Sequence, residues 1–153
     1  MKIHLATDHA GYEHKNAVSV WLMSEGYSVV DHGATVYDGE DDYPDFIARA
    51  AMAISRNPDA RAIIFGGSGQ GEAMLANRFP AVRATVLYND DEEIVALSRA
   101  HNDANVLSIG ARFVSIDATK KHIWNWLHAE RSEVERHNRR IKKVAAITKN
   151  IHL

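Results

Sequence analysis

The sequence predicts an α/β fold in which helices cover both faces of a five-stranded parallel sheet. Apolar runs of strand length alternate with segments of helical periodicity, and strands separated by helices pair in parallel through right-handed crossovers. Arg61–Phe65 is almost purely apolar, which is typical of a central strand covered on both faces. The commonest order for five such strands is 2-1-3-4-5, so the predicted fold is an open three-layer sandwich.

Glycine and proline mark the ends of the elements predicted for the first half of the chain. Gly26 follows the first helix as a C-terminal glycine, and Pro44 suits the first turn of the second. The predicted strands are Lys2–Ala6, Tyr27–Asp31 and Arg61–Phe65, and the predicted helices are Tyr12–Ser24 and Pro44–Arg56.

The second half continues the alternation and ends in two successive helices. Acidic residues follow Asp90 and Asp91, where the dipole of a helix N-terminus favours them. Ser132 and Glu135 have the spacing of a capping box. The predicted strands are Val82–Tyr88 and Asn105–Ile109, and the predicted helices are Glu72–Arg78, Asp90 or Asp91 to about Ala100, Asp117–Ala129 and Ser132–Asn150.

The composition is that of an ordinary globular protein, so we expect one domain over residues 1–153 and a cytoplasmic location. The chain has 46% hydrophobic and 25% charged residues and a net charge of −2, which does not suit a nucleic-acid binder. It contains neither the ~18 consecutive apolar residues of a membrane span nor a signal-peptide pattern. The absence of cysteine excludes disulfides, thiolate zinc sites and a cysteine nucleophile.

The predicted strand order also predicts where a site would lie. In a 2-1-3-4-5 sheet, the crevice opens at the carboxyl ends of the first and third strands. The segments that follow these strands are Thr7–Gly11 and Gly66–Glu72. A functional site should therefore be built from these two loops.

The glycine-rich loop Gly66–Gly71 is the strongest local signal. Its backbone amides could converge on an anion, although a turn kept only for tight packing would look the same. Glu72 stands where a P-loop needs lysine and where the dinucleotide fingerprint needs its third glycine, so nucleotide binding is disfavoured. At the first turn of a helix Glu72 is either a simple helix-end residue or a carboxylate base, kept ionised by the helix dipole.

Three other groups of residues could have catalytic or binding roles, although each could also have a purely structural role. Asp8-His9 follows the first strand, and His101-Asn102 ends the fourth helix, where these residues could also be turn or capping residues. Arg136 and Arg140 share one helix face and could grip a phosphate, although a basic run is more often a solvated surface. The nine histidines show no metal-ligand spacing, so no metal is expected. Together these groups suit proton transfer next to a carbonyl in a small phosphorylated substrate.

Several segments in register resemble the family of sugar-phosphate isomerases that contains ribose-5-phosphate isomerase B and galactose-6-phosphate isomerase. They run from residue 8 to residue 140. They are Asp8–Gly11, Asp42–Pro44, Gly66–Asn77, His101–Val106, Gly110–Arg112 and Arg136–Arg140. The resemblance implies a Rossmann-like sandwich, a homodimer or tetramer with active sites shared between subunits, and a cofactor-independent enzyme of the pentose phosphate pathway. The C-terminal helix 132–150 would contribute to both the site and the dimer.

The resemblance also implies roles for individual residues. Glu72 would be the base that moves a proton between C1 and C2, His101 would open the sugar ring, and Ser68 or Asp8 would shuttle the hydroxyl proton. The implied substrate-binding residues are Asp8, His9, Tyr43, Gly67, Ser68, Gly69, Gln70, Gly71, Asn102, Arg112, Arg136, His137 and Arg140.

Two departures from the family pattern bear on the mechanism and the substrate. Many members use a cysteine at the position of Gly66 as base, whereas a second branch uses a glutamate at the position of Glu72. The acidic segment Asn89–Glu93 is longer than usual. Ribose 5-phosphate is the expected substrate; allose or galactose 6-phosphate, an unphosphorylated rare sugar, or a non-catalytic sugar-phosphate binding subunit are the alternatives.

Overall fold

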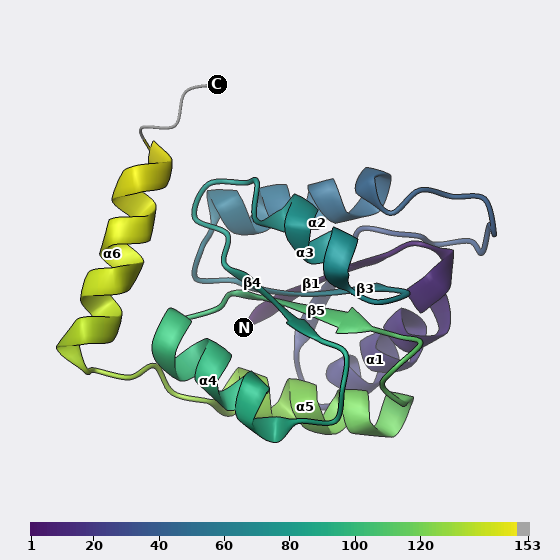
Figure 1. Cartoon of the computed structure of the whole chain (residues 1–153). Coiled ribbons are helices and arrows are strands. Elements are labelled where there is room, and N and C mark those ends of the chain that lie inside the picture. The colour runs from purple at the N-terminus through teal and green to yellow at the C-terminus, as the bar shows by residue number, and fades with distance from the viewer. Residues whose placement is uncertain (150–153) are drawn as a thin grey trace.

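The computed structural model describes residues 1–149 and contains a five-stranded sheet with helices on both faces (Figure 1). All strand pairs are parallel, as predicted. The strands are β1 (Lys2–Thr7), β2 (Ser28–Asp31), β3 (Arg61–Gly66), β4 (Ala84–Leu87) and β5 (Val106–Gly110). The α/β class and the three-layer architecture are therefore confirmed.

The order of the last two strands differs from the predicted 2-1-3-4-5. The observed order is β2-β1-β3-β5-β4, so β5 pairs with β3 and β4 lies at the edge. All residues of β5 are buried, whereas only Leu87 is buried in β4. The more completely apolar strand takes the central position because only there are both of its faces covered.

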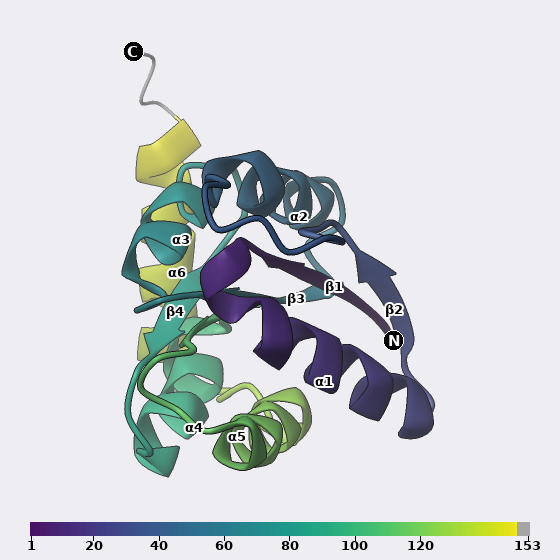
Figure 2. The ribbon, with the colours of Figure 1, turned by 90° about the vertical axis from the view of Figure 1, so that its right-hand side faces the viewer.

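The helices form two layers with separate apolar cores (Figure 2). α1 (Tyr12–Ser24), α4 (Glu92–Asn102) and α5 (Ile116–His128) cover one face, where Trp126 is fully buried. α2 (Pro44–Arg56) and α3 (Gln70–Ala76) cover the other. No helix within residues 1–149 has both the length and the apolar character needed to cross a bilayer.

Most predicted helices are found within a few residues of their predicted ends. α1 and α2 have the predicted bounds, and the Asp91 side chain caps α4 by accepting from the Glu93 amide at 2.9 Å. The last helix, α6 (Glu135–Lys149), begins three residues later than predicted. Ser132 Oγ accepts from the Val134 amide at 3.2 Å, so Ser132 makes a turn before the helix instead of its cap. The predicted end, Asn150, lies outside the described residues.

Helix α6 stands apart from the rest of the fold (Figure 1). His137 is its only buried residue within the described range, while Val144 and Ile147 are 58% and 62% exposed. A helix of this length is only marginally stable without packing against a partner. Within residues 1–149, most of α6 is therefore without a packing partner.

Candidate active site

A cleft of about 440 Å³ opens at the carboxyl ends of β1 and β3. The loops after these two strands both line it, as the sequence predicts. Its lining residues are Asp8, His9, Ala10, Tyr43, Gly67, Ser68, Gly71, Glu72, Arg112 and Phe113. Eight of these are site residues predicted from the sequence, and they converge from four separate segments.

The glycine-rich loop brings Glu72 back against the end of β3. The carboxylate of Glu72 occupies the space that a side chain at position 66 would need, because a Cβ on Gly66 would overlap it. Gly69 has a φ of 75°, a conformation that favours glycine, and its carbonyl accepts from Ser108 Oγ at 2.6 Å. Gly66 and Gly69 thus shape the loop so that Glu72 lies at the floor of the cleft.

Burial sets the charge behaviour of Glu72. The residue is only 5% exposed, and desolvation raises the pKa of its carboxyl group. A hydrogen bond from its own backbone amide acts in the opposite direction, and the nearby charge of Asp8 raises the pKa further. Burial thus acts against the helix dipole, which on its own favours the ionised form of Glu72. A carboxyl group with a raised pKa is a stronger base once ionised.

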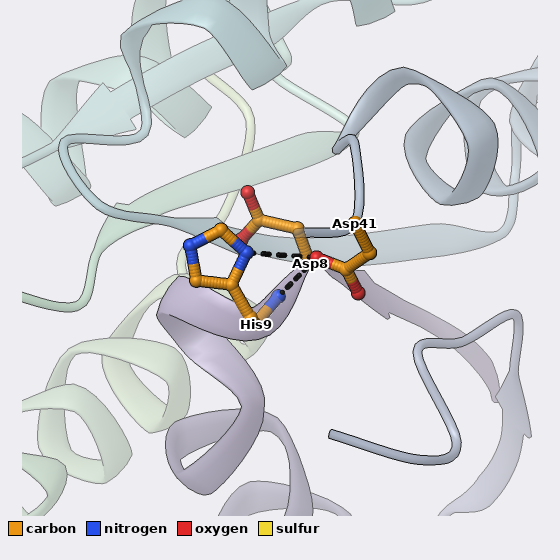
Figure 3. A group of neighbouring side chains, drawn as sticks. All are labelled: Asp8, His9 and Asp41. Carbon is orange, nitrogen blue, oxygen red and sulfur yellow. Dashed lines mark hydrogen bonds and ion pairs between the residues drawn. The ribbon is translucent and has the colours of Figure 1, made fainter. Parts of the chain in front are cut away.

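Asp8, His9 and Asp41 form a compact polar group at one side of the cleft (Figure 3). Asp8 accepts from the Ala10 amide at 2.9 Å and so caps the 3-10 turn His9–Gly11. Asp41 Oδ1 accepts from the His9 amide at 2.9 Å and lies 2.8 Å from His9 Nδ1. The hydrogen bond to Asp41 is the main reason that the pKa of His9 is raised.

Each of these three residues offers one atom that could bind a metal ion, and the three atoms lie within 4.8 Å of one another. In the structure, however, these residues are already engaged in hydrogen bonds with one another and with the backbone of the turn. The group is therefore organised as a carboxylate–imidazole pair beside a capping aspartate.

Two further side chains close the cleft around the glycine-rich loop. The guanidinium of Arg112 lies against Gly67, where an added Cβ would come within 3.2 Å of its Cζ. The Tyr43 hydroxyl lies 3.0 Å from the corresponding position on Gly71. Any larger residue at these two glycines would have to displace a side chain that lines the cleft. Gly69 and Gln70 belong to the loop but do not line the cleft.

The remaining predicted site residues lie around α4 and α6, near the amino ends of the strands and thus opposite the cleft. The rings of His101 and His137 lie 4.1 Å apart, and Arg136 Nε donates to His137 Nε2 at 3.2 Å. Desolvation lowers the pKa of His137, and the charges of His101, Arg136 and Arg140 lower it further. Asn102 ends α4 beside this group. We call His101, Asn102, Arg136, His137 and Arg140 the basic group; it carries excess positive charge.

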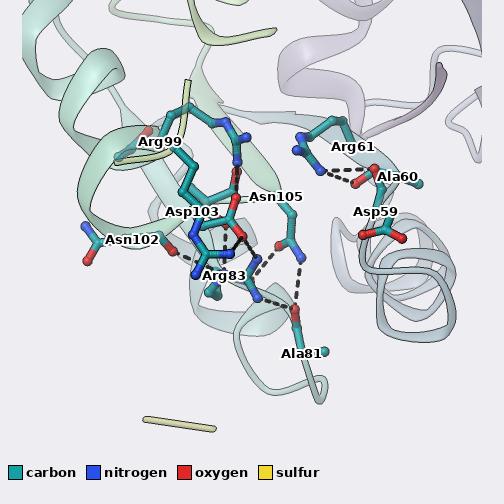
Figure 4. Close-up of polar contacts among 12 residues, drawn as sticks. Asp59, Ala60, Arg61, Ala81, Arg83, Arg99, Asn102, Asp103 and Asn105 are labelled. Atoms are coloured by element: carbon teal, nitrogen blue, oxygen red, sulfur yellow. Dashed lines mark hydrogen bonds and ion pairs between the residues drawn. The ribbon is translucent and has the colours of Figure 1, made fainter. Parts of the chain in front are cut away.

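An arginine network fixes the end of α4 next to the basic group (Figure 4). Arg83 Nε donates to the carbonyls of Asn102 and Asp103 at 3.1 and 2.8 Å. The Asp103 carboxylate accepts from Arg83 at 2.9 Å and from Arg99 at 2.7 Å. Because Arg83 directly precedes β4, this network lies at the amino ends of the strands, away from the cleft. A single chain therefore does not bring the basic group and Glu72 together.

The sequence did not identify Asp41, Phe113 or the Arg83–Asp103 network as part of these sites. Asp41 belongs to a run of acidic residues over 38–45 that is typical of a solvated surface, and its partner His9 lies 32 positions away. The Arg83–Asp103 pair spans 20 positions. Such pairs depend on the tertiary fold and have no local sequence pattern.

The fold and the cleft define a class of protein: an α/β sandwich with a buried carboxylate beside a glycine-rich loop, suited to proton transfer on a small molecule. The chain belongs to the Ribose/Galactose Isomerase family, whose model matches residues 3–144. It is 35% identical over 145 residues to ribose-5-phosphate isomerase B of Mycobacterium tuberculosis, covering 95% of this chain and 88% of the relative. It is 34% identical to the Escherichia coli protein of the same name, covering 95% of each chain.

Solved structures support the same assignment. The crystal structure of ribose-5-phosphate isomerase B from Mycoplasma genitalium with bound ribulose-5-phosphate matches with a TM-score of 0.92 and 36% identity over 97% of each chain. The enzyme from Clostridium thermocellum matches with a TM-score of 0.91 and 37% identity, covering 99% of this chain and 100% of that one. The resemblance inferred from the sequence motifs is therefore confirmed.

Proposed function

We propose that this chain is a ribose-5-phosphate isomerase that interconverts ribose 5-phosphate and ribulose 5-phosphate without a metal or organic cofactor. The observation that carries the proposal is the Glu72 carboxylate, buried against Gly66 in a cleft of a chain that belongs to this family. A phosphorylated sugar substrate and the lack of cysteine suit a single-domain cytoplasmic enzyme of the pentose phosphate pathway.

Glu72 acts as the base in the proposed reaction. It removes the proton from C2 of the open-chain aldose and returns it to C1, so that a cis-enediolate forms and then collapses to the ketose. Its raised pKa suits both steps, because the protonated acid must give the proton back. Ser68 or Asp8, which line the same cleft, shuttles the hydroxyl proton.

The glycine-rich loop stabilises the enediolate oxygen. The amide of Ser68, a residue that lines the cleft, donates to no protein atom within the described residues and is free to bind an oxyanion. Gly69 supports this amide as the next residue of the loop. Gly67, Gln70 and Gly71 complete the loop. Tyr43 and His9 flank the sugar, and Arg112 binds the phosphate from the same side.

The basic group acts in the cleft of a second copy of the chain. His101 opens the furanose ring with Asn102 beside it, and Arg136, His137 and Arg140 bind the phosphate. Two features support this arrangement. The basic group lies at the end of the sheet opposite its own cleft, and most of α6 is not packed against the described residues of its own chain. A homodimer, alone or within a tetramer, would satisfy both. A helix over 135–149 then serves both the site and the dimer.

The direct test follows ketose formation from ribose 5-phosphate in chelator-treated buffer. We expect rapid turnover by the wild-type protein and a loss of about 10²-fold or more in Glu72→Gln, with binding of the phosphorylated sugar retained. No turnover by folded protein would contradict the proposed reaction; six-carbon sugar phosphates and unphosphorylated sugars would then be tested in the same assay.

A mixing experiment tests the shared site. Glu72→Gln and His101→Asn are each expected to be inactive alone, because each removes one half of every site. After joint unfolding and refolding in equal amounts, mixed dimers contain one intact site, and random pairing restores about a quarter of wild-type activity. A mixture as inactive as its components would contradict sharing between subunits.

A further inference from the structure

Asp41 is a largely buried carboxylate whose two oxygens have different surroundings. One oxygen, Oδ1, contacts both the backbone amide and the ring Nδ1 of His9, at 2.9 and 2.8 Å. The other, Oδ2, is buried and has no hydrogen-bond partner within the described residues. The side chain is 11% exposed. A carboxylate so poorly hydrated requires a nearby positive charge, and the ring of His9 is the group in position to supply it.

The contact also fixes how His9 is presented to the cleft. Figure 3 shows the ring with Nδ1 turned toward Asp41, which leaves Nε2 as the nitrogen free for a ligand. Tyr37 packs edge-on against the same ring, with centroids 6.4 Å apart, and restricts its rotation. His9 is thus held in one orientation from two sides, by residues of the same β2–α2 connection.

We propose that Asp41 is a positioning residue that holds His9 with its Nδ1–H bonded to the carboxylate and its Nε2–H directed at the phosphate of the substrate. The inference rests on the proposed function, since it assigns His9 a phosphate ligand in that site. Asp41 itself does not touch the substrate: it is absent from the lining of the cleft. It acts by keeping the imidazolium charged and oriented.

The electrostatic surroundings of His9 favour this role. Asp8 and Asp41 both raise the pKa of His9, and the hydrogen bond to Asp41 is the larger effect. The other charged groups lining the cleft are Glu72 and Arg112. A difference in the pH dependence of phosphate affinity between two variants therefore reports on His9, because the other groups of the site, including the His137 that a second copy is proposed to supply, are the same in both. The titration of the phosphate is common to all variants and cancels in a comparison.

The test uses Asp41→Asn, with Glu40→Gln as the matched control. Asparagine keeps an acceptor oxygen at the same place but loses the charge. Glu40 is an exposed acid of the same loop, so its substitution removes one negative charge without touching His9. The His9 signals in NMR spectra, assigned by their loss in His9→Gln, report its tautomer and its pKa. Titration with inorganic phosphate reports its affinity as a function of pH.

In Asp41→Asn we expect the pKa of His9 to fall and phosphate to bind about tenfold more weakly near pH ~7.5, because a charge-assisted hydrogen bond is replaced by a neutral one. At pH ~5.5, where His9 is charged in both proteins, the affinities should converge. With ribose 5-phosphate as substrate, KM of Asp41→Asn should exceed the wild-type value near pH ~7.5 and approach it near pH ~5.5, while kcat changes little. Glu40→Gln should behave as wild type.

The inference is overturned if the pKa of His9 is unchanged in Asp41→Asn, or if phosphate affinity falls equally at all pH values, as a merely structural role would predict. Asp41→Glu, which restores the charge, should recover part of the raised pKa. Failure of the proposed function has a different signature: wild type would not convert ribose 5-phosphate, while the phosphate titration would still decide the role of Asp41.

Discussion

Replacing Gly66 with alanine tests the placement of the proposed base, Glu72, without changing Glu72 itself. A Cβ at position 66 would overlap the Glu72 carboxylate, and the nearest atoms it would meet all belong to that side chain. The φ of Gly66 is not positive, so alanine adds no backbone strain. The substitution therefore displaces the flexible end of Glu72 and leaves the surrounding backbone in place.

The size of the effect follows from this geometry. A methyl group needs the carboxylate to move by more than an ångström, and a misplacement of that size costs about 10²-fold in rate, or ~2.7 kcal/mol in the barrier. The free energy of unfolding should change by about 1 kcal/mol or less, because only a side-chain end must yield. We thus expect kcat to fall far more than the stability.

The assay measures ketose formation and chemical denaturation for Gly66→Ala, Glu72→Gln and the double variant. Because both single changes remove the same function, the double variant should be no slower than Glu72→Gln alone. Gly39→Ala is the control: Gly39 lies in an exposed loop, and its added Cβ makes an ordinary contact, 3.8 Å from the Tyr37 hydroxyl. Activity of Gly66→Ala within about threefold of wild type, or multiplicative losses in the double variant, would refute the argument.

Two further predictions concern stability. Burial raises the pKa of Glu72 in the folded state, so its favourable contribution is present below pH ~4.5 and is lost as the pH rises through the folded-state pKa. Glu72→Gln should therefore be more stable than wild type at pH 7 and similar to it at pH ~4; equal stability at both values would contradict the cause assigned. Asp103→Asn keeps a residue that tolerates the φ of 46° but leaves Arg99, whose side chain is 8% exposed, without its counter-charge. Chemical denaturation should show a loss of about 3 kcal/mol, and a loss below about 1 kcal/mol would show that the arginine network is dispensable.

The sequence predicted those parts of the fold that depend on local pattern. Helical periodicity, glycine at helix ends and Pro44 at a first turn gave the correct bounds for α1 and α2. The exchange of β4 and β5 departs from the prediction because the commonest strand order takes no account of how polar each strand is. Thr85 and the flanking Arg83 make the fourth strand polar enough for an edge, whereas Val106–Gly110 is apolar enough for the interior.

The cleft could be predicted from sequence because topology brings the ends of β1 and β3 together wherever the remaining strands pair. Both strand orders place the same two loops side by side, so the error in order did not move the site. The direction of the pKa shift of Glu72 could not be predicted this way. The helix start is visible in the sequence, but the desolvation that raises the pKa of Glu72 depends on the packing of the carboxylate beside Gly66.

The basic group supports the proposal that the site extends beyond one chain. Burial lowers the pKa of His137, and the charges of His101, Arg136 and Arg140 lower it further, so a bound anion would stabilise this concentration of positive charge. The cleft of the same chain lies at the opposite end of the strands. Helix α6 carries most of the basic group and, within the described residues, lacks the packing that a helix of its length requires. The proposed dimer resolves both problems with one contact, since it covers α6 and places the positive charge against the phosphate of a substrate held in the partner's cleft. A basic run that looks like a solvated surface in the sequence is then a phosphate site that forms only on assembly.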